Sequence, residues 1–254
     1  MGSEMCIRDR HKSLFQYNDE ELNETYEEMI KQQKDLLDAC INCCINKVQS
    51  LLKKGVDVNC ANNNKCTPLY IACEKNNLNM VRLLLDNGAE VDILANNMQT
   101  PLHAAAGRGN TDIMRLLLDK GTDVHCASED KASTSLHVAC GAGHLNAVLL
   151  LLNNGAEINQ ETNENATPLC IACQEGKIDV ARLLLQKGAD INRANINGDT
   201  PLIIACHIND INLVRLLLDN GAEVNKVNNI GVTPLLIACE YSSIEVVKLS
   251  LIHI

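Results

Sequence analysis

The sequence predicts an all-α solenoid in which helix-turn-helix units stack side by side and short hairpin-like fingers project from one edge. Three observations predict this fold: a repeated helix start, a repeated helix stop, and an interior without large aromatic side chains. With one Phe and no Trp among 254 residues, the core must consist of Leu, Ile, Val, Ala and Cys. Such side chains suit thin layers of small helices better than one thick core.

The repeated helix start is the tripeptide Thr-Pro-Leu, which contains all five prolines of the chain. Thr can accept a backbone N–H at a helix N-terminus, and Pro has the backbone shape of the first helical position. After the first such tripeptide, Leu69, Ala72 and Cys73 share one face of the expected helix. The threonines recur every 33 residues, with one extra residue before the third, at Thr67, Thr100, Thr134, Thr167, Thr200 and Thr233.

A second apolar stripe follows in each unit and stops at a glycine. Val81, Leu84 and Leu85 align at helical spacing, and the glycine after them can adopt the left-handed conformation that ends a helix. The residues from this glycine to the next threonine are too polar for a core strand and too poor in helix formers for a helix, so we expect an exposed finger. The glycines are Gly55, Gly88, Gly121, Gly155, Gly188 and Gly221.

The whole pattern, Thr-Pro-Leu-His-x-Ala followed by Leu-Leu-Leu-x-x-Gly-Ala-x-Val-Asn, resembles the ankyrin repeat over roughly residues 35 to 249. The resemblance implies an ankyrin-repeat solenoid with a protein-binding surface. The chain departs from the pattern at Ser135, which replaces proline, and at the finger glycine, which is present only at Gly198 and Gly231. These departures bear on the geometry of the fingers rather than on the fold. The other fingers carry Lys65, Met98, Ala132 and Asn165 at the glycine position.

The repeat divides the chain into segments. We expect an N-terminal helical and acidic segment over 11–34 and a short opening unit over 35–58. The N-terminal segment should form a helix that covers the open end of the stack, with Asn18 and Glu21 as a capping box. Its acidic residues are interpreted as a solvated helix face, with a ligand for a basic partner as the alternative. The repeat array continues to residue 248 as units 59–92, 93–125, 126–159, 160–192, 193–225 and 226–248.

The two ends of the chain are expected to be artefacts of sequence assembly. The final residues 249–254, Leu-Ser-Leu-Ile-His-Ile, and residues 4–10 can be encoded by one short DNA read in opposite orientations. That DNA resembles a transposon end used to prepare sequencing libraries. We therefore exclude residues 1–10 and 249–254 from functional reasoning and expect the natural protein to continue the last repeat.

The cysteines recur at one slot of the repeat, six residues after the threonine. We interpret this slot as a place where neighbouring helices approach closely and need a small apolar residue, because Ala106 occupies it in one unit. Adjacent helices pack about 8–10 Å apart, too far for a ladder of disulfides. Reduced thiols indicate an intracellular and most simply cytoplasmic protein. The recurring cysteines are Cys73, Cys140, Cys173, Cys206 and Cys239.

No other motif predicts catalysis, a cofactor or a metal site. Cys40, Cys43 and Cys44 have the spacing of half a zinc site, but a structural zinc site usually needs two close pairs, so we place Cys43 and Cys44 in a turn between helices. His103 and His137 occupy equal repeat positions and are expected to hydrogen-bond back to the helix start. The sequence therefore predicts a protein that is not an enzyme.

Charge and hydropathy narrow the choice of partners. The formal net charge is −10 and no basic stretch is present, which disfavours nucleic acid. No apolar run approaches the length of a transmembrane helix, so no membrane insertion is expected in this region. We expect a monomer, apart from association through the incomplete C-terminal unit.

The resemblance implies a scaffold that binds a protein partner on the concave surface formed by the fingers and the first helices. The alternative is the targeting or regulatory region of a larger enzyme, effector or channel. The surface is rich in Asn and acidic residues, which predicts a polar partner of basic character, with His207, Ile208 and Tyr241 as bulkier anchors. The expected contact positions are Asn63, Asn64, Glu74, Lys75, Asn96, Asn97, Gln99, Arg108, Asp130, Lys131, Glu164, Gln174, Glu175, Asn197, Asp199, His207, Ile208, Asn229, Glu240 and Tyr241.

Overall fold

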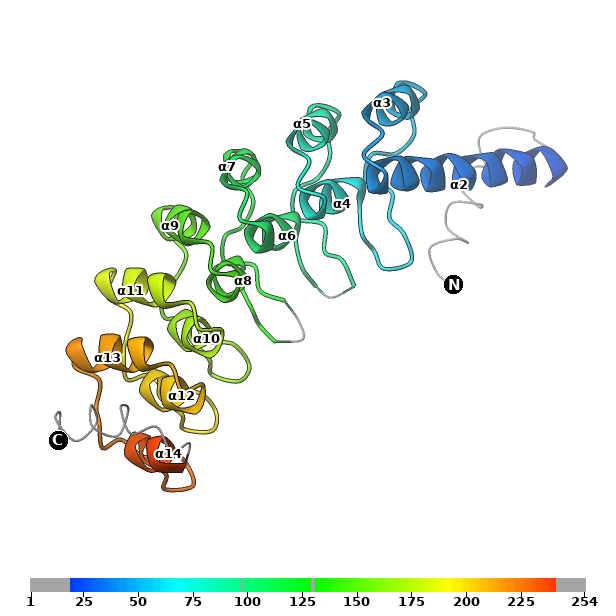
Figure 1. The fold of residues 1–254 in the computed structure, drawn as a ribbon. Helices are drawn as coiled ribbons and strands as arrows, with labels where there is room; N and C mark the ends of the chain where they lie inside the picture. Colours follow the sequence, from blue (N-terminus) through cyan, green and yellow to red (C-terminus); the bar gives the residue numbers. More distant parts are fainter. Residues whose placement is uncertain (1–18, 97, 129–130, 241–254) are drawn as a thin grey trace.

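The computed structural model describes residues 19–96, 98–128 and 131–240 of the chain. Within these residues there are thirteen helices, and the only sheet-like feature is an isolated bridge between Ala127 and Thr134. Figure 1 shows the helices stacked in two layers along an arc, with the connecting fingers on its concave side. The predicted all-α solenoid is confirmed.

The opening unit consists of α2 (Asp19–Ile41) and α3 (Ile45–Lys53). The remaining helices of the concave layer are α4 (Pro68–Glu74), α6 (Pro101–Arg108), α8 (Ser135–Ala142), α10 (Pro168–Gln174), α12 (Pro201–His207) and α14 (Pro234–Glu240). The remaining helices of the convex layer are α5 (Leu78–Asp86), α7 (Thr111–Asp119), α9 (Leu145–Asn153), α11 (Ile178–Gln186) and α13 (Ile211–Asp219). Even-numbered helices thus line the concave side and odd-numbered helices the convex side (Figure 1).

The concave helices start where the Thr-Pro-Leu pattern predicts. The Thr67 hydroxyl accepts the backbone N–H of Tyr70 at 3.2 Å, and the threonines before α10 and α12 cap their helices in the same way. In α6 and α8 a histidine takes part in the cap, because the backbone N–H groups of Thr100 and Thr134 donate to Nδ1 of His103 and His137, at 3.2 and 3.1 Å. The expected hydrogen bond from each histidine back to the helix start is confirmed.

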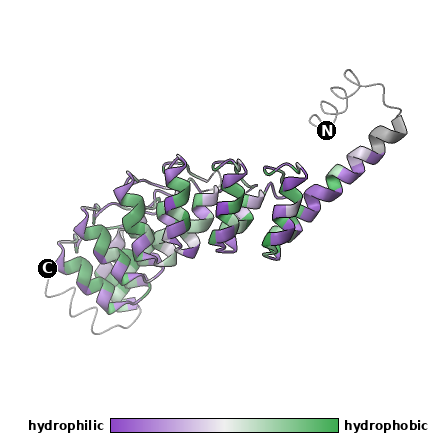
Figure 2. Ribbon diagram, turned by 90° about the horizontal axis from the view of Figure 1, so that it is seen from above, coloured by the Kyte–Doolittle hydropathy of each residue, from purple (hydrophilic) through white to green (hydrophobic). Residues whose placement is uncertain are grey.

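One continuous hydrophobic core runs along the stack between the two layers. Figure 2 shows that the helices have a hydrophobic and a hydrophilic side, as this arrangement requires. The repeated cysteine slot lies inside this core: Cys73, Cys140, Cys173 and Cys206 are fully buried, as is Ala106. The interpretation of the slot as a small packing residue is confirmed at these positions, whereas Cys239 of the last described helix is exposed.

The N-terminal helix differs from expectation in what it covers. Only the second half of α2 packs against the stack, where Leu36 and Cys40 are buried. The first half projects past the end of the array (Figure 1), and Tyr26, Met29 and Ile30 are exposed. The expectation that the helix covers the open end of the stack is therefore wrong for its first half, because α2 continues straight instead of folding across that face.

The boundary between α2 and α3 lies where the cysteine cluster predicts a turn. Cys43 has a left-handed backbone, with φ of 55°, and Cys44 precedes the first residue of α3. The placement of both cysteines in the turn is confirmed. Asn18, half of the expected capping box, lies outside the described residues, as do residues 1–10 and 249–254.

Candidate protein-binding surface

The surface is built from six fingers, each of which precedes a concave helix. We number them one to six, for residues 61–66, 94–99, 127–133, 161–166, 194–199 and 227–232. Three fingers are shaped by an asparagine five residues before the threonine. Asn62 Oδ1, for example, accepts the backbone N–H groups of Asn64 and Cys66 at 2.9 and 3.0 Å, and Asn195 and Asn228 act alike in fingers five and six.

Each finger turns at a residue with a left-handed backbone, whether or not that residue is glycine. Gly198 and Gly231 have φ values of 77° and 78°, and the corresponding positions of the other fingers, Lys65, Met98, Ala132 and Asn165, lie between 51° and 55°. The residues that replace glycine therefore keep the positive φ angle of the turn. Because residues other than Gly and Asn rarely adopt this backbone conformation, Lys65, Met98 and Ala132 carry local backbone strain.

Neighbouring fingers are joined at their tips by backbone hydrogen bonds. The N–H of Asn96 donates to the carbonyl of Asn64 at 2.8 Å, and that of Ile196 donates to the carbonyl of Glu164 at 2.7 Å. The same bond joins Asn163 to Lys131 at 2.8 Å and Asn229 to Asn197 at 3.0 Å. These bonds hold the fingertip side chains at fixed places along the concave edge.

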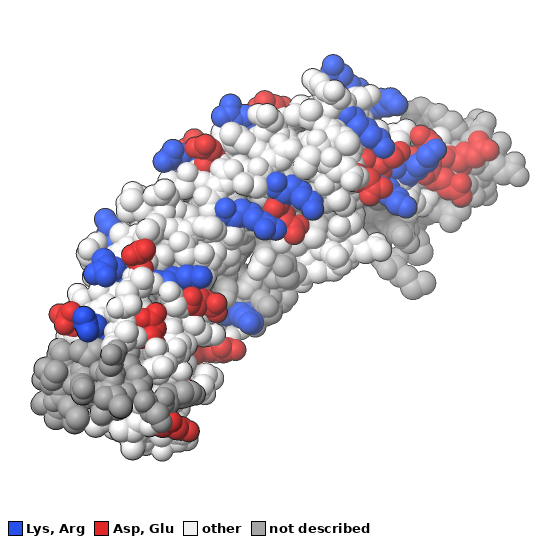
Figure 3. Space-filling model, in the orientation of Figure 1, with Lys and Arg blue, Asp and Glu red and all other residues white. Residues whose placement is uncertain are grey.

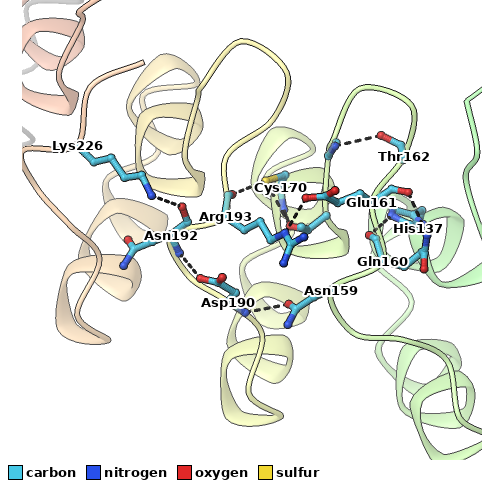
Figure 4. A network of polar contacts seen from close by, with 12 residues as sticks. His137, Asn159, Gln160, Glu161, Thr162, Cys170, Asp190, Asn192, Arg193 and Lys226 are labelled. Atoms are coloured by element: carbon cyan, nitrogen blue, oxygen red, sulfur yellow. Dashed lines mark hydrogen bonds and ion pairs between the residues drawn. The ribbon is translucent and has the colours of Figure 1, made fainter. Parts of the chain in front are cut away.

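A second row of hydrogen bonds joins the bases of the fingers. The side-chain carbonyls of Asn59, Asn159 and Asn192 each accept a backbone N–H from the next unit at 2.9 Å. Figure 4 shows part of this row, in which the backbone N–H of Asp190 donates to Asn159 Oδ1. Nearby, Lys226 Nζ donates to the backbone carbonyl of Asn192 at 2.9 Å. Each of these asparagines stands four residues after the glycine that ends a convex helix, which was the signal available to find them.

Several polar contacts meet near the start of the fourth finger (Figure 4). Arg193 Nε donates to Glu161 Oε1 at 2.6 Å beside a shallow hollow of about 570 Å³, lined by residues 157–161 and Arg193. His137 contacts Gln160, one of the residues that line this hollow (Figure 4). Its Nδ1 contacts the Thr134 hydroxyl, and its Nε2 lies 3.0 Å from the Gln160 carbonyl oxygen. Burial lowers the pKa of His137, so the ring is neutral at pH 7 and accepts at Nδ1 while it donates from Nε2.

The cysteines near this surface are not activated. Burial raises the pKa of Cys170, and the thiol donates to the Arg193 carbonyl at 3.5 Å. Burial also raises the pKa of Cys140 and Cys173 above the usual range, and that of Cys206 to about 12. Protonated thiols are poor nucleophiles and poor metal ligands. Within the described ranges, no group of His, Cys, Asp and Glu side chains is arranged to hold a metal ion.

The sequence-predicted contact residues fall on the fingers and on the C-terminal ends of the concave helices. Among those that the structure describes, all are exposed except Gln99 and Asp199, which are half-buried. Asp199 accepts a hydrogen bond from Asn228 Nδ2 at 2.8 Å, and the side chains of Asn96 and Asn229 donate to carbonyls of the preceding fingers. These polar groups are therefore partly used within the array. Outside the described residues lie Asn97, Asp130 and Tyr241.

Three exposed aliphatic residues on the fingers were not among the predicted contacts: Ile196, Val227 and Ile230. Aligning the units on their threonines would have found two of them. Ile196 and Ile230 replace asparagines that stand at the corresponding positions of the first two fingers.

A curved stack of helix pairs, with hydrogen-bonded fingers along its concave edge, defines a helical-repeat solenoid with an extended binding surface. The model of the ankyrin repeats family (3 copies) matches residues 36–128, 121–195 and 193–253, and the chain belongs to this family. Ankyrin repeats are generally protein–protein interaction modules, and those related to this chain are typically without enzymatic activity.

Among solved structures, the chain is similar to the crystal structure of the human ASB11 ankyrin repeat domain. The two share 30% sequence identity with a TM-score of 0.77, and the match covers 86% of this chain and 97% of the other. Comparison with curated proteins found no match. None of the described helices is both long and apolar enough to cross a membrane.

Proposed function

We propose that this chain is a scaffold that binds a partner protein on its concave surface, through the fingers and the C-terminal ends of the concave helices. The observation that carries the proposal is the hydrogen-bonded row of fingers, whose exposed side chains are held in place by the bonds between Asn96 and Asn64 and between Ile196 and Glu164. A surface that is already ordered loses little conformational entropy on binding.

The charge of the surface supports a protein partner rather than nucleic acid. On the face drawn in Figure 3, lysines and arginines alternate with carboxylates and form no continuous basic stripe. A protein bound to nucleic acid needs such a stripe to replace the counterions of the phosphate backbone. With a net charge of −10, the chain is better suited to a partner of basic character.

The buried thiols support an intracellular, cytoplasmic site of action. The twelve described cysteines are free, and Cys73, Cys140, Cys173 and Cys206 at the helix-packing slot are buried. Such thiols persist in a reducing compartment. To test this assignment, the free thiols are alkylated in cells, and the protein is then isolated and its mass measured.

The proposed surface is tested by comparing variants of its two sides. Partner proteins cross-linked to the array in cells of the source organism are identified, and the affinity of a purified partner is measured. Replacing His207, Ile208 and Tyr241 by Ala is expected to weaken binding by at least about 2 kcal/mol, the scale of a hot spot. Replacing Arg82 and Arg182 of the convex helices by Ala is expected to leave it unchanged. The opposite pattern would contradict the assignment.

A further inference from the structure

Four asparagines of the chain directly precede a glycine: Asn87, Asn154, Asn197 and Asn220. In such a pair the backbone nitrogen of the glycine can attack the side-chain carbonyl carbon of the asparagine, because glycine has no Cβ atom to hinder the approach. All four asparagines are exposed to solvent. Exposure therefore does not distinguish them, whereas the hydrogen bonds of their side chains do.

Three of the four side chains are held by the helix that precedes them. Asn87, Asn154 and Asn220 are the C-terminal caps of the convex helices α5, α9 and α13. Nδ2 of each donates to the backbone carbonyl four residues earlier, at 2.8, 2.8 and 2.7 Å. The bond keeps the side-chain amide against the last turn of the helix, so attack by the following glycine requires that it break first.

Asn197, at the tip of finger five, lacks this restraint. Its backbone is held, because its N–H donates to Asn195 Oδ1 and its carbonyl accepts the N–H of Asn229, both at 3.0 Å. Its side chain forms no hydrogen bond with a described residue. The glycine N–H is engaged in all four pairs, at 2.8 Å for Gly198 and between 3.0 and 3.2 Å for the others. The difference between the pairs therefore lies in the side chain of the asparagine.

The glycine that follows Asn197 is required by the contact between fingers five and six. Gly198 has a φ of 77°, and a Cβ atom at this position would lie 2.7 Å from the backbone nitrogen of Asn229. Because a backbone atom cannot move aside as a flexible side chain can, only glycine fits here without a shift of finger six. The packing of the fingers thus keeps an Asn-Gly pair at an exposed tip.

We propose that Asn197 is a modification site, at which the folded chain deamidates spontaneously. The Gly198 nitrogen bonds to Asn197 Cγ, and its proton leaves with the side-chain amide group as ammonia, which closes a succinimide ring. Water then opens the ring at one of its two carbonyl carbons and gives either aspartate or isoaspartate. The conversion needs no partner, oxidant or reductant, so it is independent of the proposed scaffold function.

The two products change finger five in different ways. Both add one negative charge at a position that is predicted to contact a partner. In isoaspartate the main chain runs through the former side chain and is longer by one methylene group. The carbonyl that accepts the N–H of Asn229 then becomes a carboxylate outside the main chain. The bond between fingers five and six cannot keep its present geometry in this product.

The test incubates the purified chain at mildly alkaline pH, which favours loss of the amide proton, and follows each Asn-Gly pair by mass spectrometry of its peptides. We expect Asn197 to convert at least fivefold faster than Asn87, Asn154 and Asn220, which serve as controls within the same sample. Electron-transfer fragmentation distinguishes aspartate from isoaspartate. Conversion of Asn197 that is no faster than that of the other three would overturn the proposal.

The same measurement on the chain unfolded in guanidinium chloride tests whether the fold is the cause. There the four pairs should convert within about twofold of one another, because the helix caps no longer hold three of them. If Asn197 kept its fivefold lead, the neighbouring sequence would be responsible and the structural argument would be wrong.

Hydrogen exchange at the amide of Asn229 tests the consequence for the fingers. We expect faster exchange in aged protein that carries isoaspartate at position 197. The Asn197→Gln variant, aged in parallel, should show no such change, because the larger ring needed for attack on Gln forms much more slowly. Unchanged exchange in the isoaspartate form would refute the predicted loss of the bond between fingers five and six.

Discussion

Single residues determine how much strain the fingers store. The left-handed turn position costs a residue with a Cβ atom roughly 1–3 kcal/mol, less for Asn. Three fingers place Lys65, Met98 and Ala132 there, at φ values between 51° and 55°. The hydrogen bonds between fingers maintain the conformation despite this cost.

Replacing Lys65, Met98 or Ala132 by Gly is expected to stabilise the array by about 1 kcal/mol each, because Gly adopts the turn without a steric penalty and loses only part of that gain to unfolded-state entropy. Urea denaturation measures the change. Asn165→Gly is the matched control and should change stability by only a few tenths of a kcal/mol, since Asn tolerates the left-handed conformation. Equal effects at all four positions would argue against strain as the cause.

A second prediction at this scale concerns Thr122. Its hydroxyl is buried and has no hydrogen-bond partner among the described residues, whereas Ala89, Ala156 and Ala189 occupy the same position in other units. Thr122→Ala is expected to stabilise the protein by about 1 kcal/mol, because it removes an unsatisfied polar group. Thr67→Ala, which removes a helix cap, should instead destabilise it by about 1 kcal/mol. Denaturant unfolding of both variants distinguishes the two roles.

At the level of elements, the concave helices α6 and α8 are joined to the following units through buried histidines. His103 Nε2 reaches the Ser133 carbonyl at 3.0 Å, and His137 Nε2 reaches the Gln160 carbonyl at 3.0 Å. Their Nδ1 atoms accept from the cap threonines, so both rings must be neutral to keep these bonds. Tyr70, Cys170 and Ile203 occupy the same position in other units.

These histidines predict a pH dependence. Burial lowers the pKa of His103 and His137 in the folded state, while the unfolded side chains titrate near about 6.5. Below that pH the unfolded state binds more protons, so stability falls as the pH drops from about 6.5 toward the lowered folded pKa, by up to about 1.4 kcal/mol per pH unit for each histidine. The full contribution is present above about pH 6.5.

Urea denaturation at pH 7.5, 6.5 and 5.5 measures this loss. The His103→Tyr, His137→Cys double variant, which introduces residues found at the same position of other units, should lose most of the dependence. If the stability of the double variant changed with pH as steeply as that of the wild type, groups other than these two histidines would be responsible.

At the scale of the whole molecule, stability is shared between neighbouring units, so a unit with one neighbour is less stable than one with two. The last described helix shows the difference at one position. Leu236 of α14 is 56% exposed, whereas its counterpart Ile203 in α12 is completely buried beneath the next unit. The aliphatic side chain in α14 therefore contributes little to the core.

Hydrogen exchange is expected to reflect this gradient. Amide protons of residues 233–240, which include the exposed Leu236, should exchange faster than those of residues 167–188, in which Leu169 and Leu184 are fully buried. Mass spectrometry of peptides after deuterium labelling measures both segments in one experiment. Equal protection would mean that the exposure of Leu236 does not reflect a lower local stability of α14.

The repeat, the helix starts and the core positions could be read from the sequence, because each depends on local chemistry that recurs at a fixed spacing. Thr67 and Pro68 start a helix in any context that allows one, and Leu69 and Cys73 then face the same side. The candidate surface was predicted only as a set of repeat positions. Which of these positions are already hydrogen-bonded, as at Asp199, and which aliphatic side chains remain exposed, as at Ile230, was not predictable from the unit alone.

The sequence by itself determined the fold, because a solenoid needs only contacts within a unit and between adjacent units, and both repeat with the sequence. Tertiary structure alone decided two features: the projection of the first half of α2 beyond the stack, and the bonds between fingers. The bonds between fingers join atoms that are about 30 residues apart along the chain, and the position of α2 depends on which of its residues pack against other helices. Such interactions leave no local signal, and they shape the surface on which a partner would bind.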